Sequence, residues 1–148
     1  MDLCRLLREA VDVYEYVAEE KKIRVVAELP AACEAEVDAI RIRQVFANLL
    51  DNAIKYTPEG GTVTISAAAR GEDAVVQFRD TGIGVPVEEQ QKIWERLYRG
   101  DKSRSQRGLG LGLSVVKAVI EAHGGKASVT SQPGQGSEFT VLLPVKAA

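Results

Sequence analysis

The sequence predicts an α+β fold, a two-layer sandwich in which a mixed, mostly antiparallel sheet is covered on one face by helices. Two stretches, one opening the chain and one around residues 39–56, carry apolar residues at the helical spacing of three and four. Two pairs of alternating segments, within residues 62–79 and 127–143, are each joined by a short Gly-containing turn. Adjacent hairpins without strict β-α-β alternation favour an antiparallel sheet with helices on one side.

An opening helix of about five turns is predicted by apolar residues that share one face, namely Leu3, Leu6, Leu7, Ala10, Val13, Tyr14 and Val17. Alternation over residues 23–28 then predicts a short strand. A second helix is expected from about Ala39 to Tyr56 and is ended by the Pro and Gly residues of 58–61. Its apolar stripe consists of Ile42, Val45, Phe46, Leu49, Leu50 and Ala53.

The second half of the chain predicts two hairpins and a third helix. Antiparallel strands are expected over residues 62–69 and 74–79. A helix around residues 113–120 should end at a pair of glycines, and a closing hairpin follows over 127–132 and 137–143. Between these parts, the Gly-, Ser- and Lys/Arg-rich residues up to 112 lack periodicity, which predicts a mobile lid at about residues 95–112.

Length and composition restrict the class of protein. A chain of 148 residues fits one domain, so residues 1–148 are expected to form a single unit. Nineteen Lys and Arg against 21 Asp and Glu leave a net charge of −2, which disfavours nucleic-acid binding. No apolar run approaches about 18 residues and no signal-peptide layout opens the chain. We therefore expect a cytoplasmic domain without membrane contact, or the cytosolic part of a membrane-anchored protein.

The cysteines and the single histidine do not predict a zinc site. Cys4 and Cys33 lie far apart in the sequence and no second cysteine pair accompanies them, so the usual ligand set cannot be assembled. They are interpreted as reduced thiols. His123 is expected at a helix end, where an imidazole complements the C-terminal carbonyls, and a structural role is favoured for it.

A polar stripe lies beside the apolar stripe of the second helix. Asn48, Asn52 and Lys55 are spaced four and three apart, so their side chains share one edge. Asparagine is a poor helix former, which suggests that something else requires these residues. Carboxamide oxygens can ligate Mg²⁺, and a lysine can meet phosphate oxygens. Taken alone, an ordinary solvated helix face is the better explanation.

Two Gly-containing motifs add to this. Asp80-Thr81-Gly82-Ile83-Gly84 follows a predicted strand, so a carboxylate suited to an amine donor stands beside glycines that let backbone approach a ligand; a plain turn explains it equally well. Gly108-Leu109-Gly110-Leu111-Gly112 precedes a helix start that can receive phosphate oxygens, with a flexible hinge as the alternative. Its spacing fits neither the dinucleotide fingerprint nor the P-loop.

Together these segments resemble the histidine kinase branch of the superfamily that also holds type II topoisomerase, mismatch-repair and heat-shock chaperone ATPases. The resemblance spans nearly the whole chain. Residues 44–56 are similar to its N box, 80–84 to its first glycine box, 93–101 to its F box and 108–112 to its second glycine box. The F box departs from the pattern, since Trp94 and Leu97 stand where phenylalanines are usual.

The resemblance implies roles for individual residues, with ATP and Mg²⁺ as cofactors. Asn52 would be the principal Mg²⁺ ligand with Asn48 assisting, and Lys55 would meet phosphate. Tyr56 would flank the base and Asp80 would accept its amino group. Further nucleotide contacts are assigned to Gly82, Ile83, Gly84, Gly108, Leu109, Gly110, Leu111, Gly112, Leu113 and Thr140.

The same resemblance carries a prediction about catalysis. Asn48, Lys55 and Arg99 are the predicted catalytic residues, with Lys102 as a weaker candidate near the γ-phosphate. Relatives that hydrolyse ATP have a glutamate where this chain has Asn48, and a carboxamide cannot accept a proton at neutral pH, so hydrolysis should be very slow. The acceptor histidine of the family, on an upstream helical hairpin, has no counterpart here.

The sequence therefore predicts a protein-histidine kinase module of a two-component system. It would bind Mg-ATP and transfer the γ-phosphoryl group to a histidine on a separate dimerisation domain of the same kinase, with a response regulator downstream. Two alternatives remain: a non-enzymatic, nucleotide-gated interaction module that uses the surface around Leu109 and Leu111, and a serine-directed kinase relative.

Overall fold

A computed structural model gives the fold and describes residues 1–84, 90, 92–94, 112–132 and 134–146. The helices are α1 (Leu3–Glu20), α2 (Ala39–Lys55) and α3 (Gly112–Ala122), with a short 3₁₀ segment η2 (Lys92–Trp94). The strands are β1 (Arg24–Glu28), β2 (Thr62–Arg70), β3 (Asp73–Asp80), β4 (Lys126–Gln132) and β5 (Gly136–Pro144).

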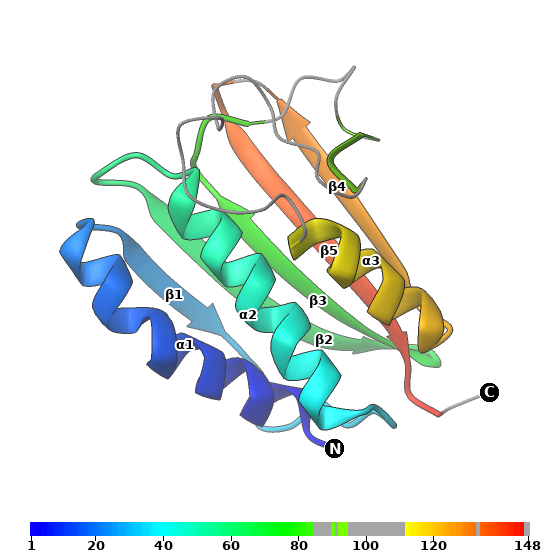
Figure 1. Cartoon of the computed structure of the whole chain (residues 1–148). Coiled ribbons are helices and arrows are strands. Elements are labelled where there is room, and N and C mark those ends of the chain that lie inside the picture. The colour runs from blue at the N-terminus through cyan, green and yellow to red at the C-terminus, as the bar shows by residue number, and fades with distance from the viewer. Residues whose placement is uncertain (85–89, 91, 95–111, 133, 147–148) are drawn as a thin grey trace.

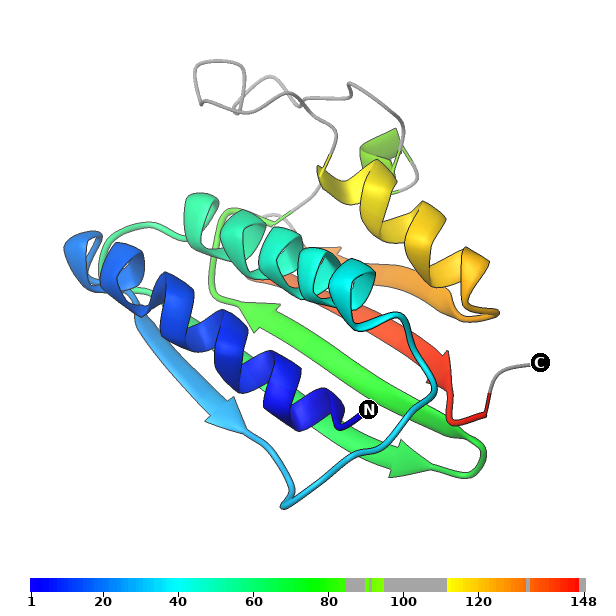
Figure 2. The same ribbon diagram turned by 60° about the horizontal axis from the view of Figure 1, so that its bottom comes forward.

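The five strands form one sheet in the order β1-β2-β3-β5-β4. Strands β1 and β2 run parallel, and every other neighbouring pair is antiparallel. Figure 1 shows α1, α2 and α3 side by side in front of the sheet, and the turned view in Figure 2 shows all three on the same face. The predicted fold class is therefore confirmed.

The two long helices begin at aspartate caps. Asp2 precedes α1, and its Oδ1 accepts the backbone N–H of Cys4 and that of Cys33, both at 3.0 Å. Asp38 precedes α2, and its Oδ1 accepts the N–H groups of the first helical turn at 3.1 and 3.2 Å. Both cysteine thiols are free, and burial raises their pKa. The cap at Asp2 therefore ties the start of α1 to the segment that leads into α2.

Helix α2 supplies the centre of the core. Its predicted apolar stripe is buried in full, with every member at most 1% exposed. Phe46 of α2 meets Phe78 of β3 with ring centroids 6.0 Å apart. Helix α1 runs parallel to α2. Arg43, near the start of α2, bonds to Glu9 in the first half of α1 at 3.0 Å, and Lys21, at the end of α1, bonds to Ile54 at the end of α2. The C-terminal half of α2 is thus held on the sheet beside the end of β3.

The predicted apolar face of α1 is only partly correct. Leu3, Leu7 and Ala10 are buried as expected, but Val13 is 71% and Val17 44% exposed, so the prediction is wrong for these two valines. Val17 lies seven residues, almost two full turns, after Ala10 and so on the same side of the helix, yet the buried residue near the end of α1 is Ala18, which is 1% exposed.

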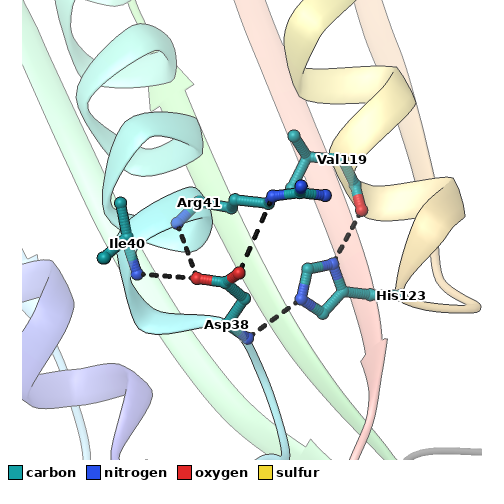
Figure 3. Close-up of polar contacts among 5 residues, drawn as sticks. All are labelled: Asp38, Ile40, Arg41, Val119 and His123. Atoms are coloured by element: carbon teal, nitrogen blue, oxygen red, sulfur yellow. Dashed lines mark hydrogen bonds and ion pairs between the residues drawn. The ribbon is translucent and has the colours of Figure 1, made fainter.

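His123 connects the end of α3 to the start of α2, as Figure 3 shows. Its Nδ1 lies 2.8 Å from the Val119 carbonyl oxygen, and its Nε2 lies 3.0 Å from the backbone nitrogen of Asp38. The Asp38 N–H must donate to Nε2, so the proton of a neutral ring sits on Nδ1. This arrangement supports the structural role that the sequence favoured, and Gly124 follows with a φ of +77°.

The two ends of the described chain meet at one place. Ala35 donates its N–H to the Met1 carbonyl at 2.9 Å, and Glu36 donates to the Val145 carbonyl at 2.9 Å. The N label in Figure 1 lies at this end of the molecule. Within the described residues, no helix is long and apolar enough to cross a membrane.

Candidate nucleotide site

The predicted polar edge of α2 is present near the C-terminal end of the helix. Asn48, Asn52 and Lys55 are all half-buried. The Asn48 amide Nδ2 donates to the carbonyl of Gly112, the first residue of α3, at 3.4 Å. Because Nδ2 faces α3, the carboxamide oxygen of Asn48 is available as a ligand for a hard cation. Asp51, which sequence reasoning did not assign, pairs with Lys55 at 3.0 Å across one helical turn.

Asp80 ends β3 with a buried carboxylate that is 5% exposed. Its Oδ1 accepts two backbone N–H groups, from Gly82 at 2.8 Å and from Ser137 at 3.2 Å. Burial raises the pKa of Asp80, and the two hydrogen bonds partly offset that rise. Within the described part of the chain, no donor bonds Oδ2. A buried acid with one oxygen held and the other open is suited to accept a ligand amine.

Gly82 is required by the protein's own packing. A Cβ at this position would collide with the Tyr56 carbonyl oxygen and lie 2.8 Å from Asp80 Oδ1. The next residue, Ile83, donates its N–H to the same Tyr56 carbonyl at 3.1 Å. The sequence explained this glycine by close approach to a ligand, whereas the close approach found is to the end of α2. The loop after β3 is therefore joined to the helix that carries Lys55. Gly84 has a φ of +75°.

Two residues at the start of β5 lie against Asp80 and were not predicted from the sequence. Ser137, buried beside Asp80, holds Oδ1 from the neighbouring strand. Gly136 has a φ of +96°, and a Cβ there would collide with the Asp80 carbonyl oxygen. The signal was present in the sequence, because a small polar residue at 137 continues the inward-facing row of Phe139 and Val141.

Thr140 is not brought to this group. It pairs in register with Gln77 of β3, whose amide donates to the Thr140 hydroxyl at 3.4 Å. Asp80 lies an odd number of residues from Gln77, and successive side chains of a strand point to opposite faces. Thr140 therefore lies on the face of the sheet that the helices leave uncovered. The structure thus does not bring Thr140 to Asp80, where Ser137 lies instead, and a nucleotide contact of Thr140 stays a prediction.

Tyr56 forms the C-cap of α2 and is half-buried, beside a hollow of about 210 Å³. The hollow is lined by Lys21, Lys55, Tyr56, Thr57, Pro58 and Ile83. Thr57 is fully buried, and its hydroxyl donates to the Ala53 carbonyl at 2.7 Å. Among the described residues, no cluster of three His, Cys, Asp or Glu side chains could hold a metal ion.

The start of α3 closes the described part of the site. Gly112 begins the helix beside Asn48, and Leu113 packs on the core. The other residues of the second glycine motif, Gly108 to Leu111, lie outside the described residues. So do Arg99, Lys102 and the predicted lid up to residue 111, and their assignments stay predictions.

The described part of the F box is anchored by its atypical tryptophan. Trp94 of η2 meets Phe139 of β5 edge to face, with ring centroids 5.7 Å apart. Ile93 also packs against the core. The Trp94 ring therefore packs η2 against strand β5 of the sheet. Leu97 lies outside the described residues.

Comparisons with known proteins identify the family. The model of the histidine kinase-, DNA gyrase B-, and HSP90-like ATPase family matches residues 37–147. The adaptive-response sensory kinase SasA of Thermosynechococcus vestitus is 43% identical over 147 residues, which is 98% of this chain and 39% of that protein. The sensor-like histidine kinase SenX3 of Mycobacterium bovis is 38% identical over 146 residues, 97% of this chain and 36% of that protein. This chain thus spans well under half the length of these relatives.

Solved structures agree. The catalytic domain of histidine kinase ThkA superposes with a TM-score of 0.88 at 29% identity, covering 99% of this chain and 94% of that one. Full-length ShkA in complex with AMPPNP gives 0.88 at 31% identity, covering 100% and 31%. ThkA in complex with the response regulator TrrA gives 0.83 at 28% identity, covering 98% and 41%. The chain belongs to this ATPase family, as the ATP-binding catalytic domain of a sensor histidine kinase.

Proposed function

We propose that the chain binds Mg-ATP between the end of α2, the loop after β3 and the start of α3, and transfers the γ-phosphoryl group to a histidine on a separate dimerisation domain. The observation that carries this proposal is the Asp80 carboxylate, buried and held through Oδ1 by Gly82 and Ser137. Its Oδ2 can accept the amino group of adenine. Tyr56 lies at the adjoining helix end, where its ring can flank the base.

The residues of α2 suit a magnesium-bridged triphosphate. Asn52 and Asn48 offer neutral carboxamide oxygens, and Mg²⁺ commonly takes few protein ligands with phosphate oxygens and waters completing its shell. When bound, the ion would neutralise charge on the phosphates. Lys55 would exchange its partly exposed partner Asp51 for a phosphate oxygen. Arg99 stays a predicted contact of the γ-phosphate. Since Asn48 cannot act as a base, water should be a poor acceptor and ATP hydrolysis slow.

The acceptor is proposed to be a histidine outside this chain. His123 is the only histidine of the 148 residues, and both of its ring nitrogens are engaged, by Val119 and by Asp38. It also lies at the opposite end of α3 from Gly112. Phosphorylating it would break the link between α3 and α2, so a role as phosphoacceptor conflicts with its contacts.

We further propose the partners and compartment of a two-component kinase. The dimerisation domain of the same kinase would supply the acceptor, and a response regulator would receive the phosphoryl group. The complex of ThkA with its response regulator supports the second partner. The net charge of −2 and the lack of a membrane-spanning helix among the described residues support a cytoplasmic location without nucleic-acid contact.

The test is transfer in trans. The chain, a separate domain bearing the acceptor histidine on its dimerisation helices, and ATP labelled in the γ-phosphate should yield an acid-labile label on histidine. Asn52→Ala should abolish labelling because the metal loses its main protein ligand. Ile40→Ala, at an exposed position of the same helix outside the N box, is the matched control and should label normally. Demonstrated ATP binding without any histidine label would contradict the proposed transfer.

A further inference from the structure

Lys21 reaches from the end of α1 to the end of α2. It forms the C-cap of α1, and its own backbone N–H donates to the Val17 carbonyl at 3.3 Å. Its side chain crosses to the neighbouring helix, where the ammonium donates to the carbonyl oxygens of Ile54 and Lys55, both at 2.8 Å. Two short bonds from one ammonium fix its position.

These two carbonyls belong to the last turn of α2, whose C=O groups have no N–H donor further along the helix. The Ile54 carbonyl also accepts the Thr57 N–H at 3.4 Å. The other carbonyls of this turn are bonded locally: Asn52 accepts from the Tyr56 N–H, and Ala53 accepts from the Thr57 hydroxyl. The ammonium thus completes a set of caps at the negative end of the helix dipole. Burial lowers the pKa of Lys21, so the bonds hold this cation in a place where desolvation opposes its charge.

The end of α2 that Lys21 caps carries Lys55 and Tyr56. Lys55 is proposed to contact the phosphates, and Tyr56 is proposed to flank the base. Lys55 accepts from Lys21 through its carbonyl and extends its own side chain to Asp51. Tyr56 follows directly and accepts the Ile83 N–H, which joins the turn to the loop after Asp80. Lys21, Lys55, Tyr56 and Ile83 line the same hollow of about 210 Å³.

We infer that Lys21 is a positioning residue of the nucleotide site. By holding the last turn of α2 through two carbonyls, it sets the place of Lys55 and Tyr56 and, through the Tyr56–Ile83 bond, of the loop that follows Asp80. The inference rests on the proposed ATP binding and adds a residue that lies outside all four motifs of the sequence.

The experiment measures the Kd for Mg-ATP by titration calorimetry, and the melting temperature separately, for four chains. Lys21→Met keeps the length of the side chain and removes its donors, and we expect its Kd to rise roughly tenfold, as for the loss of charged hydrogen bonds. Lys21→Arg retains a cation with several donors and should recover most of the affinity. Lys22→Met is the matched control, because the side chain of Lys22 is exposed and, among the described residues, makes only an exposed ion pair to Glu59.

The outcomes separate positioning from plain stabilisation. If Lys21→Met melts earlier but its folded form binds Mg-ATP within about twofold of the wild type, a difference too small for a lost hydrogen bond, the inference is overturned. If Lys21→Met does not fold, Lys21→Ala, which also lacks a side-chain donor, replaces it, and an unchanged Kd in that variant is equally fatal. The wild type and Lys22→Met report on the proposed function itself: if neither binds Mg-ATP, ATP binding is refuted, and the role of Lys21 with it.

In a full-length kinase the same substitution should raise the KM for ATP far more than it lowers kcat, because the chemistry of transfer is untouched once nucleotide is bound. A fall in kcat with no change in the KM for ATP would count against a positioning role. Backbone amide resonances of Tyr56 and Ile83 should shift in Lys21→Met and stay in place in Lys22→Met.

Discussion

The backbone N–H of Ser137 donates to Oδ1 of Asp80 at 3.2 Å, across the β3–β5 pair. This bond and the one from Gly82 both use Oδ1, so the orientation of the carboxylate is set before any ligand arrives. Ionising the buried carboxylate costs free energy, and the two bonds recover only part of it. The protein therefore places a carboxyl group whose ionisation is opposed by burial at the position where adenine is proposed to bind.

Asp80→Asn should stabilise the fold at neutral pH and abolish nucleotide binding. The pKa of Asp80 is raised in the folded state, so its contribution to stability is present below the unfolded pKa of about 3.9 and is lost as pH rises through the folded pKa. Asparagine escapes that loss and keeps an oxygen for Gly82 and Ser137, but it places an amide donor opposite the ligand amine. Its melting temperature should exceed that of the wild type near neutrality, with the difference disappearing in acid.

The control for this experiment is Asp73→Asn, an exposed carboxylate at the start of the same strand. Its free energy of unfolding should stay within about 0.5 kcal/mol of the wild type. An Asp80→Asn variant that is less stable than the wild type at neutral pH would show that the buried carboxylate stabilises the fold, contrary to this account.

Gly82→Ala should weaken nucleotide binding through a steric effect inside the protein. The added methyl would collide with the Tyr56 carbonyl, so the loop after β3 must move away from the end of α2 and the Ile83 bond must lengthen. Overpacking of this kind costs about 1–3 kcal/mol of stability. Melting and Mg-ATP titration would measure both effects.

Gly71→Ala provides the comparison. Gly71 has a φ of +63° but open space around its Cα, so alanine there suffers only backbone strain, about 1–2 kcal/mol. Both variants should melt earlier, yet only Gly82→Ala should lose affinity. Equal affinities would mean that the contact between Gly82 and Tyr56 has no part in the site.

Trp94 should contribute to stability through its ring contact with Phe139. Trp94→Phe keeps an aromatic ring and should cost less than about 1.5 kcal/mol, whereas Trp94→Ala should cost about 2 kcal/mol. Tyr16→Ala, on an exposed part of α1, should change stability by less than about 0.5 kcal/mol. Chemical unfolding followed by circular dichroism would check all three, and equal stabilities of the Phe and Ala variants would show that the ring makes no useful contact.

Periodicity predicted the helices and hairpins well because each apolar stripe is also a buried stripe, as along α2. It failed at Val13 and Val17, which share the helical period of the buried residues and yet are exposed, because how much of a stripe is covered depends on the assembled fold and not on the local pattern. The site was predicted through α2 and Asp80, whose chemistry is unusual for their local structure. The alternation of β5 favours Ser137 rather than Thr140 as the neighbour of Asp80.

Other features could not be read from the chain. The need for glycine at position 82 comes from a carbonyl 26 residues earlier in the sequence. The contacts of Lys21 likewise depend on the parallel packing of α1 and α2, since a lysine at the end of an amphipathic helix is ordinarily solvated. Both features arise where three segments distant in sequence meet.

The meeting of Met1 and Val145 at residues 35 and 36 makes the chain a candidate for circular permutation. A short linker between the present ends would bridge neighbouring points, and new ends could be opened at Gly71, where the turn tip has open space. Val145 also bonds to Glu72, so the joined original ends and the new ends at Gly71 would lie at the same end of the sheet. In such a permuted chain the opposite end of the sheet, where Asp80 lies, would stay uninterrupted. A reporter protein fused at the new ends would then lie far from the proposed nucleotide.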